Sequence, residues 1–432
     1  MDKITFLGAG STVFAKNVLG DCLLTPSLQE FEYALFDIDP ARLSDSAVML
    51  SAINSNMNAG RARVVTYDDR RKALEGAAFV VNAVQVGGYE PSTVIDFEIP
   101  KKYGLRQTIG DTLGIGGIFR ALRTIPVILD FAHDMADVCP DALLLNYSNP
   151  MAMLTAALLR HGGVRAVGLC HSVQVCVPHL FRDLGMDAAG VKSRIAGINH
   201  MAWLLTVEKD GVDLYPEIKA RAASRPTPHT DMVRYEIMRR FGHYVTESSE
   251  HNAEYNPWFI KRRMPELIER YAIPLDEYPR RCIEQIEDWK RMREHLTENR
   301  ALRHERTQEY ASYIMDAIQT DVPFRIAGNV LNTGLITNLP SEACVEVPCM
   351  VDRTGINPCH VGALPVQLAA LNMTNVNVQL VAVEAAVTHR RDMVYQAALL
   401  DPHTAGELSM DEVVGLCDDL IEAHGSRIPA LR

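Results

Sequence analysis

The feature that most constrains the fold is a regular alternation of short apolar runs with helix-length segments over the first 190 residues. Apolar runs typical of strands occupy residues 3–7, 32–36, 63–66, 79–83, 143–145 and 166–169. Between them, the segments 13–23, 40–57 and 151–159 have the length and pattern of helices. Strands separated by helices predict a parallel sheet with right-handed crossovers. We therefore expect an α/β fold that begins with a Rossmann-type, doubly wound parallel sheet.

The pattern changes beyond about residue 190. A longer strand-like run at 193–198 is followed by a hairpin signal at Lys209-Asp210-Gly211 and by charged helical segments at 267–271 and 284–303. A chain of 432 residues is long enough for two domains. We expect a Rossmann-type domain over 1–192 and a mixed α+β domain over 193–432, with a functional cleft between them.

Charge and cysteine content exclude several classes of protein. Lys and Arg number 43 and Asp and Glu 54, which gives a net charge of −11. Such an acidic chain is not expected to bind nucleic acid or an anionic membrane surface. Neither a secretory leader nor a run of about 18 apolar residues is evident, so a cytoplasmic protein is predicted. The nine scattered cysteines, without a C-x-x-C pair, disfavour a disulfide framework and a structural zinc site.

A glycine-rich turn follows the first strand and opens the first helix. Gly8 and Gly10 permit a tight turn, and Ser11 and Thr12 begin a helix whose free N–H groups suit a pyrophosphate. Val13 replaces the third glycine of the usual fingerprint, so an ordinary glycine turn is the alternative.

Two polar residues at the ends of later strands strengthen the dinucleotide interpretation. Asp37 follows the second strand, where its carboxylate can accept hydrogen bonds from ribose hydroxyl groups and would repel a 2′-phosphate. This favours NAD over NADP. Asn82 ends the fourth strand at the same carboxyl edge of the sheet, so it joins the expected cofactor site.

A second polar cluster follows the fifth and sixth strands and the run at 193–198. It comprises Asn149, the pair Cys170-His171 and the pair Asn199-His200. Cysteine, histidine and carboxamide side chains suit a divalent metal or a polar substrate. On spacing alone, Cys170 can equally be a packing residue and His200 a buried core histidine, and Asn149 can cap the following helix.

Taken together, these motifs resemble glycoside hydrolase family 4, and within it the α-galactosidases. The likeness runs nearly end to end. Its motifs lie at residues 8–12, 86–91, 114–123, 149–151, 170–173, 197–200, 246–251 and 401–404.

The resemblance implies an α-galactosidase that uses NAD and Mn²⁺ to hydrolyse α-D-galactosides such as melibiose. The reaction would proceed by oxidation at C3, elimination, water addition and re-reduction, a known departure from the two-carboxylate scheme of most glycosidases. It also implies that Cys170 and His200 bind the metal and that Asn149 and Asn199 bind sugar hydroxyls. Residues 1–192 would then bind NAD and residues 193–432 the substrate and metal, in a homo-oligomer.

Two proton-transfer roles are also implied. His171 stands where some relatives carry an acidic proton donor, although it can also be a simple helix-start residue. Tyr255 is the expected base, provided that a nearby cation lowers the pKa of its phenol, ordinarily about 10. Glu247, Glu250 and His251 are competitors for that role, and Tyr255 can instead form an apolar wall with Trp258.

Three alternatives remain open from the sequence. The Cys-His-Ser-Val motif at 170–173 resembles members that act on unphosphorylated α-galactosides, but 6-phosphoglycosides or uronides would be possible if Arg120, Arg123 or Arg281 converged on an anion. An NAD-dependent dehydrogenase of a hydroxy acid or sugar would carry a similar cofactor domain. A nonenzymatic regulator that binds NAD or a sugar is the third alternative.

Overall fold

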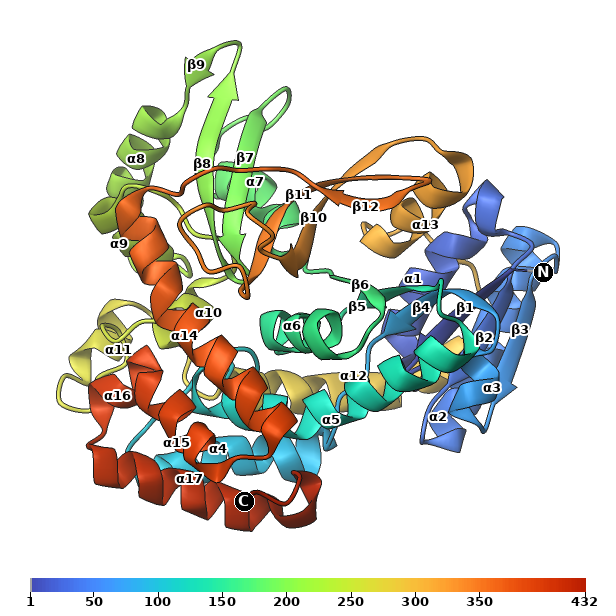
Figure 1. Cartoon of the computed structure of the whole chain (residues 1–432). Helices are drawn as coiled ribbons and strands as arrows, with labels where there is room; N and C mark the ends of the chain where they lie inside the picture. Colours follow the sequence, from blue (N-terminus) through green and yellow to red (C-terminus); the bar gives the residue numbers. More distant parts are fainter. Residues whose placement is uncertain (1) are drawn as a thin grey trace.

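The computed structural model describes residues 2–432, so Met1 lies outside it. One continuous sheet of twelve strands runs through the molecule in the order β3-β2-β1-β4-β5-β6-β10-β11-β7-β8-β9, with β12 paired to β11 (Figure 1). The strands are β1 (Lys3–Leu7), β2 (Glu32–Phe36), β3 (Arg63–Tyr67), β4 (Ala77–Asn82), β5 (Leu143–Asn146), β6 (Arg165–Gly168), β7 (Lys192–Ile198), β8 (Met201–Lys209), β9 (Val212–Asp213), β10 (Phe324–Leu331), β11 (Cys344–Asp352) and β12 (Gly355–Pro358).

The first six strands form the predicted parallel sheet, which confirms the Rossmann-type α/β fold. Strands β4 and β5 are almost entirely buried, as expected when helices cover both faces of a parallel sheet. Leu7 pairs with Asn82, Asn82 with Asn146, and Asn146 with Gly168. Strands β1, β4, β5 and β6 therefore end level with one another, and the loops that follow them share one edge.

Helices connect these strands, and they include the three that the sequence predicts at 13–23, 40–57 and 151–159. Asp39 caps α2 by accepting the backbone N–H groups of Ala41 and Arg42, and Pro40 occupies the first helical position, where its missing N–H costs nothing. The helices of the first half are α1 (Thr12–Leu23), α2 (Pro40–Asn58), α3 (Arg70–Leu74), α4 (Val94–Lys102), α5 (Gly114–Val138), α6 (Met151–His161) and α7 (Ser172–Asp183).

The second half mixes strands and helices, as expected. Asp210 and Gly211 both have positive φ, 53° and 79°, and form the predicted hairpin turn between β8 and β9. Its helices are α8 (Tyr215–Ser224), α9 (Met232–Phe241), α10 (Ser249–Glu254), α11 (Glu266–Arg270), α12 (Glu277–Glu298), α13 (Tyr310–Thr320), α14 (Val366–Thr388), α15 (Arg391–Leu400), α16 (Pro402–Glu407) and α17 (Met410–His424).

The helix expected at 284–303 begins earlier and ends earlier than its charge pattern indicates. Helix α12 stops at Glu298, and the chain that follows is held against α2. The side-chain amide of Asn56 donates to the carbonyl oxygens of Arg300 and Leu302, at 2.8 and 2.9 Å. This tertiary contact overrides the local helical pattern, so the prediction for 299–303 was wrong.

The two halves are joined within the sheet itself. Strand β10 pairs with β6 at Asn329 and Gly168, and β11 pairs with β7 at Glu346 and Gly197. A Cβ atom on Gly168 would lie 2.4 Å from the hydroxyl oxygen of Thr155. A larger residue would therefore displace this junction. The division at 192/193, which falls at the start of β7, stays a prediction.

No helix within residues 2–432 combines the length and the apolar character that a membrane span needs. The nine cysteines, all within this range, are free thiols, in line with the expected lack of disulfides.

A buried ion pair between α4 and α5 also contacts the end of α17, which lies at the bottom of Figure 1. Asp96 on α4 accepts two hydrogen bonds from the Arg123 guanidinium on α5, at 2.6 and 3.2 Å, and contacts His424 Nε2 at the end of α17 at 2.9 Å. Asp96 and Arg123 are each only 2% exposed. Loss of either partner would leave an uncompensated charge in the core.

We predict that Asp96→Ala lowers the free energy of unfolding by about 3–5 kcal/mol, because Arg123 would lose its buried counter-ion. Glu98→Ala on the same helix is the matched control, since Glu98 is 59% exposed and its ion pair with Lys101 lies at the surface. The control should change stability by less than about 1 kcal/mol. Urea unfolding followed by circular dichroism measures both, and equal effects would contradict the prediction.

Candidate active site

The glycine-rich turn after β1 packs closely against the backbone that follows β4. Gly8 has φ of +89°, and a Cβ atom there would lie 2.9 Å from the backbone of Ala83, so only glycine fits without strain. The N–H of Gly10 donates to the carboxylate of Asp37 at 2.6 Å. The predicted cofactor residues Gly8, Gly10 and Asp37 therefore lie together at the carboxyl ends of β1 and β2.

The other predicted cofactor residues lie beside this turn. Ser11 precedes α1 without a side-chain cap bond, whereas the hydroxyl of Thr12 contacts the carbonyl of Gly10 at 3.3 Å and is buried. Asn82 is fully buried and donates to the Asn146 carboxamide at 2.9 Å. The side-chain carbonyl oxygen of Asn82 has no hydrogen-bond partner among residues 2–432.

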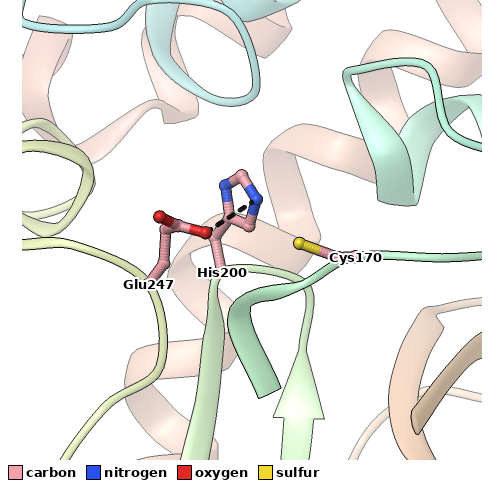
Figure 2. A group of neighbouring side chains, drawn as sticks. All are labelled: Cys170, His200 and Glu247. Carbon is pink, nitrogen blue, oxygen red and sulfur yellow. Dashed lines mark ion pairs between the residues drawn. The ribbon is translucent and has the colours of Figure 1, made fainter. Parts of the chain in front are cut away.

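Cys170, His200 and Glu247 point toward a common centre from three different loops (Figure 2). One donor atom from each lies within 4.8 Å of the other two, a spacing that one metal ion can bridge. Nε2 of His200 lies 3.4 Å from a Glu247 carboxylate oxygen. The structure therefore brings together the two predicted metal ligands, which follow β6 and β7, and adds a carboxylate to them.

Tyr255 fixes the orientation of the His200 ring. Its hydroxyl group lies 2.9 Å from Nδ1 of His200, and both side chains are buried. This contact occupies Nδ1 and leaves Nε2 facing the cluster. A hydrogen bond to the distal ring nitrogen commonly sets the tautomer of a metal-binding histidine.

Charge at the cluster is dominated by Glu247. Burial opposes ionisation of its carboxyl group, but His200, His251 and the Ser248 N–H outweigh that effect and lower its pKa to about 2. Burial raises the pKa of the Cys170 thiol to about 11, and the nearby Glu247 carboxylate adds to the shift. At neutral pH the metal-free cluster therefore holds a carboxylate and a protonated thiol.

The two predicted substrate residues differ in their surroundings. Asn149 donates to the carboxylate of Asp111 at 3.1 Å. Asn199 is fully buried, and both polar atoms of its carboxamide lack a standard hydrogen-bond partner within the described chain. Its side chain lies close enough to the Cys170 thiol to lower the pKa of that group slightly against the larger effect of burial. A buried unpaired carboxamide is costly, so Asn199 is suited to a ligand.

The two predicted proton-transfer residues are already engaged. Nε2 of His171 lies 2.8 Å from a Glu309 carboxylate oxygen, and this hydrogen bond raises the pKa of the imidazole. Burial, reinforced by the nearby carboxylates Asp111, Glu254 and Glu247, raises the pKa of Tyr255 well above its usual value. Trp258 lies apart, 42% exposed and stacked on Phe241.

Asp111 is the residue that sequence reasoning missed. It lies between Asn149 and His251, whose Nε2 is 3.9 Å from its carboxylate. Burial opposes its ionisation, but Arg120 and the two nearby histidines hold its pKa below the usual range. Asp111 follows Ile109-Gly110, and no strand ends there, so the sequence pattern gave no reason to select it. Glu247 was considered only as a competing base, not as a metal ligand.

Comparison with known proteins identifies the family. Residues 3–186 match the family 4 glycosyl hydrolase model, and residues 195–404 match the model of its C-terminal domain. An α-galactosidase of Bacillus subtilis is 63% identical over 99% of both chains. An α-galactosidase of Rhizobium meliloti is 37% identical over 99% of this chain and 89% of its own length. The chain therefore belongs to glycosyl hydrolase family 4.

A solved structure shows the same fold. A 6-phospho-α-glucosidase from gut microorganisms, crystallised with NAD and Mn²⁺, superposes with a TM-score of 0.79 at 21% identity and covers 100% of both chains. At that identity the likeness extends to the fold alone.

We predict that Cys170 in the metal-free protein reacts about 200-fold more slowly with iodoacetamide at pH 8 than an ordinary thiol, because a pKa of about 11 leaves only about 0.1% as thiolate. The rate should rise about tenfold per pH unit up to pH 10. Peptide mapping by mass spectrometry measures this, with Cys170→Ser identifying the modified peptide. A rate that levels off near pH 8.5 would contradict the assigned pKa.

Proposed function

We propose that the protein hydrolyses α-D-galactosides such as melibiose, with NAD and Mn²⁺ as cofactors. One observation carries the proposal. The Cys170–His200 cluster and the turn that joins Gly8 to Asp37 both lie at strand ends of one continuous sheet. The 63% identical relative named an α-galactosidase supports the choice of sugar. As the family resemblance implies, we also expect a homo-oligomer.

The residues present fit both cofactors. The tight turn at Gly8, where a Cβ atom would collide with the backbone of Ala83, the carboxylate of Asp37 and the unpaired side-chain carbonyl of Asn82 suit a dinucleotide. Cys170 and His200 would hold the metal. When bound, NAD supplies hydride transfer at the sugar and Mn²⁺ polarises a sugar oxygen, which together make elimination of the aglycone possible.

The side chains of this chain position the sugar and move protons. Asn199, buried and unpaired, would hydrogen-bond sugar hydroxyls, and Asn149 would do so from its place beside Asp111. His171 would protonate the departing oxygen, supported by the raised pKa of its imidazole. Tyr255 would serve as the base once the bound cation offsets the burial and the carboxylates that raise the pKa of its phenol in the metal-free protein.

The surroundings of the arginines favour an uncharged sugar. Arg123 is paired with Asp96, and Arg281 with Glu277 and Glu250. Arg120 donates to the Tyr278 hydroxyl at 3.1 Å and is attracted to Asp111. These guanidinium groups already have partners, so they do not form an open cluster for a phosphate or a uronate. This supports unphosphorylated galactosides over the alternatives.

The proposal is tested with p-nitrophenyl α-D-galactoside and protein stripped of NAD and metal. We expect release of p-nitrophenol only when NAD and Mn²⁺ are both restored, without accumulation of NADH at 340 nm. Stoichiometric NADH would instead indicate the dehydrogenase alternative. Cleavage that is indifferent to NAD would overturn the redox mechanism, and cleavage confined to 6-phosphogalactosides or galacturonides would overturn the substrate.

A second prediction concerns cofactor choice. Asp37→Ala should weaken NAD binding by about 10–100-fold, because the carboxylate that would accept hydrogen bonds from the ribose is removed. It should also bring the affinities for NAD and NADP closer together, since the repelling charge is removed. Isothermal titration calorimetry measures both. Asp39→Asn is the matched control, because Asp39 caps α2 and asparagine keeps that cap. Unchanged NAD affinity in Asp37→Ala would contradict the assignment.

A further inference from the structure

We propose that Glu247 is a third protein ligand of the metal, alongside Cys170 and His200. The inference rests on the proposed function, because it concerns the same metal. Its geometric basis is the cluster in Figure 2, in which the three donor atoms lie within 4.8 Å of one another. Among residues 2–432, this is the group of three histidine, cysteine or acidic side chains that is compact enough to hold one ion.

The position of Glu247 is fixed by the backbone on both sides. The N–H of Thr246 donates to the carbonyl of Ala202 at 2.8 Å, and the Thr246 hydroxyl accepts the Ala202 N–H at 3.1 Å. The side-chain amide of Asn252 donates to the carbonyls of Thr246 and Ser248 at 3.0 and 3.1 Å. The Thr246 contacts fasten the segment to β8, the strand that starts directly after His200, and the Asn252 contacts hold the turn around Glu247.

Glu247 and His200 both have a left-handed backbone, with φ of 64° and 63°. This conformation is uncommon for residues other than glycine, and where it persists it commonly marks a functional site. Here it occurs at two residues whose side chains meet. The local backbone is therefore arranged so that a carboxylate faces the free Nε2 of His200.

The donor set also suits the charge of the ion. A Cys170 thiolate and a Glu247 carboxylate together carry two negative charges, which balance a divalent cation in a largely buried site. Sulfur and nitrogen donors alone favour zinc or iron, whereas a carboxylate is a preferred ligand of Mn²⁺. Three protein ligands still leave positions open for substrate oxygens, as a catalytic metal requires.

Glu250, on the same segment, provides a contrast. Its carboxylate is paired with Arg281 at 3.3 Å, and it is not part of the three-residue cluster. Substitution of Glu250 changes a nearby charge without removing a donor. A Glu250 variant therefore distinguishes the loss of a metal ligand from the loss of a nearby negative charge.

The test is Mn²⁺ binding to the full-length protein without substrate, measured from the electron paramagnetic resonance signal of free Mn²⁺. Glu247→Gln keeps the shape of the side chain but removes its charge, and it should raise the Kd by at least about tenfold. Glu250→Gln should leave the Kd within about twofold, and Glu247→Asp should recover part of the loss. Zn²⁺ affinity should fall less than Mn²⁺ affinity in Glu247→Gln.

Further measurements separate the possible failures. The thermal unfolding midpoint of the metal-free protein and its Kd for NAD should be unchanged in Glu247→Gln, which shows that the variant is folded. If Mn²⁺ binds Glu247→Gln normally but binds Cys170→Ser weakly, the role of Glu247 is overturned and the proposed function stands. If Cys170→Ser and His200→Ala also bind Mn²⁺ normally, the metal site of the proposed function fails as well.

Discussion

The geometry of the Cys170–His200–Glu247 cluster depends on how the two halves of the sheet are joined. The side-chain amide of Asn329 donates both to the carbonyl of Gly168 at 3.3 Å and to the Glu346 carboxyl group at 3.1 Å. Asn329 and Glu346 pair through the backbone with Gly168 and Gly197 respectively. The carboxyl group of Glu346 is buried in the core, and this burial raises its pKa well above the usual value. Because β6 and β7 end within three residues of the cysteine and histidine of the cluster, this junction sets their separation.

Much of the first half could be predicted because its signals are local. Buried parallel strands appear as short apolar runs, and the predicted runs at 3–7 and 32–36 match β1 and β2 residue for residue. The rule that parallel strands end at one edge of a sheet then predicted that Gly8, Asp37 and Cys170 lie at the same edge. The insertion of β10 and β11 between β6 and β7 could not be predicted, because it pairs residues about 150 positions apart that carry no matching local pattern.

The remaining features of the site are set by tertiary contacts. His171 was singled out from its neighbour Cys170, but its partner Glu309 comes from a segment 138 residues later. The left-handed turn that aims Glu247 at His200 involves residues for which that backbone is uncommon, so propensity gives no hint of it. Tyr255 was chosen from a short aromatic motif, and the structure adds the hydrogen bond through which it acts on His200.

Electrostatics links the fold to the selection of substrate. Glu247 and Asp111 both have lowered pKa values despite burial, so two carboxylates remain ionised beside the residues expected to bind the sugar. The two charges of a divalent cation would be balanced by a Cys170 thiolate and the Glu247 carboxylate. The negative charge of Asp111 is therefore not balanced by the metal. Arg120 offsets that charge, but its guanidinium is already shared between Asp111 and Tyr278 and is not free to bind an anionic substrate. Discrimination against phosphorylated or uronic substrates would then arise from the lack of a free guanidinium among these groups, while a neutral galactoside needs none.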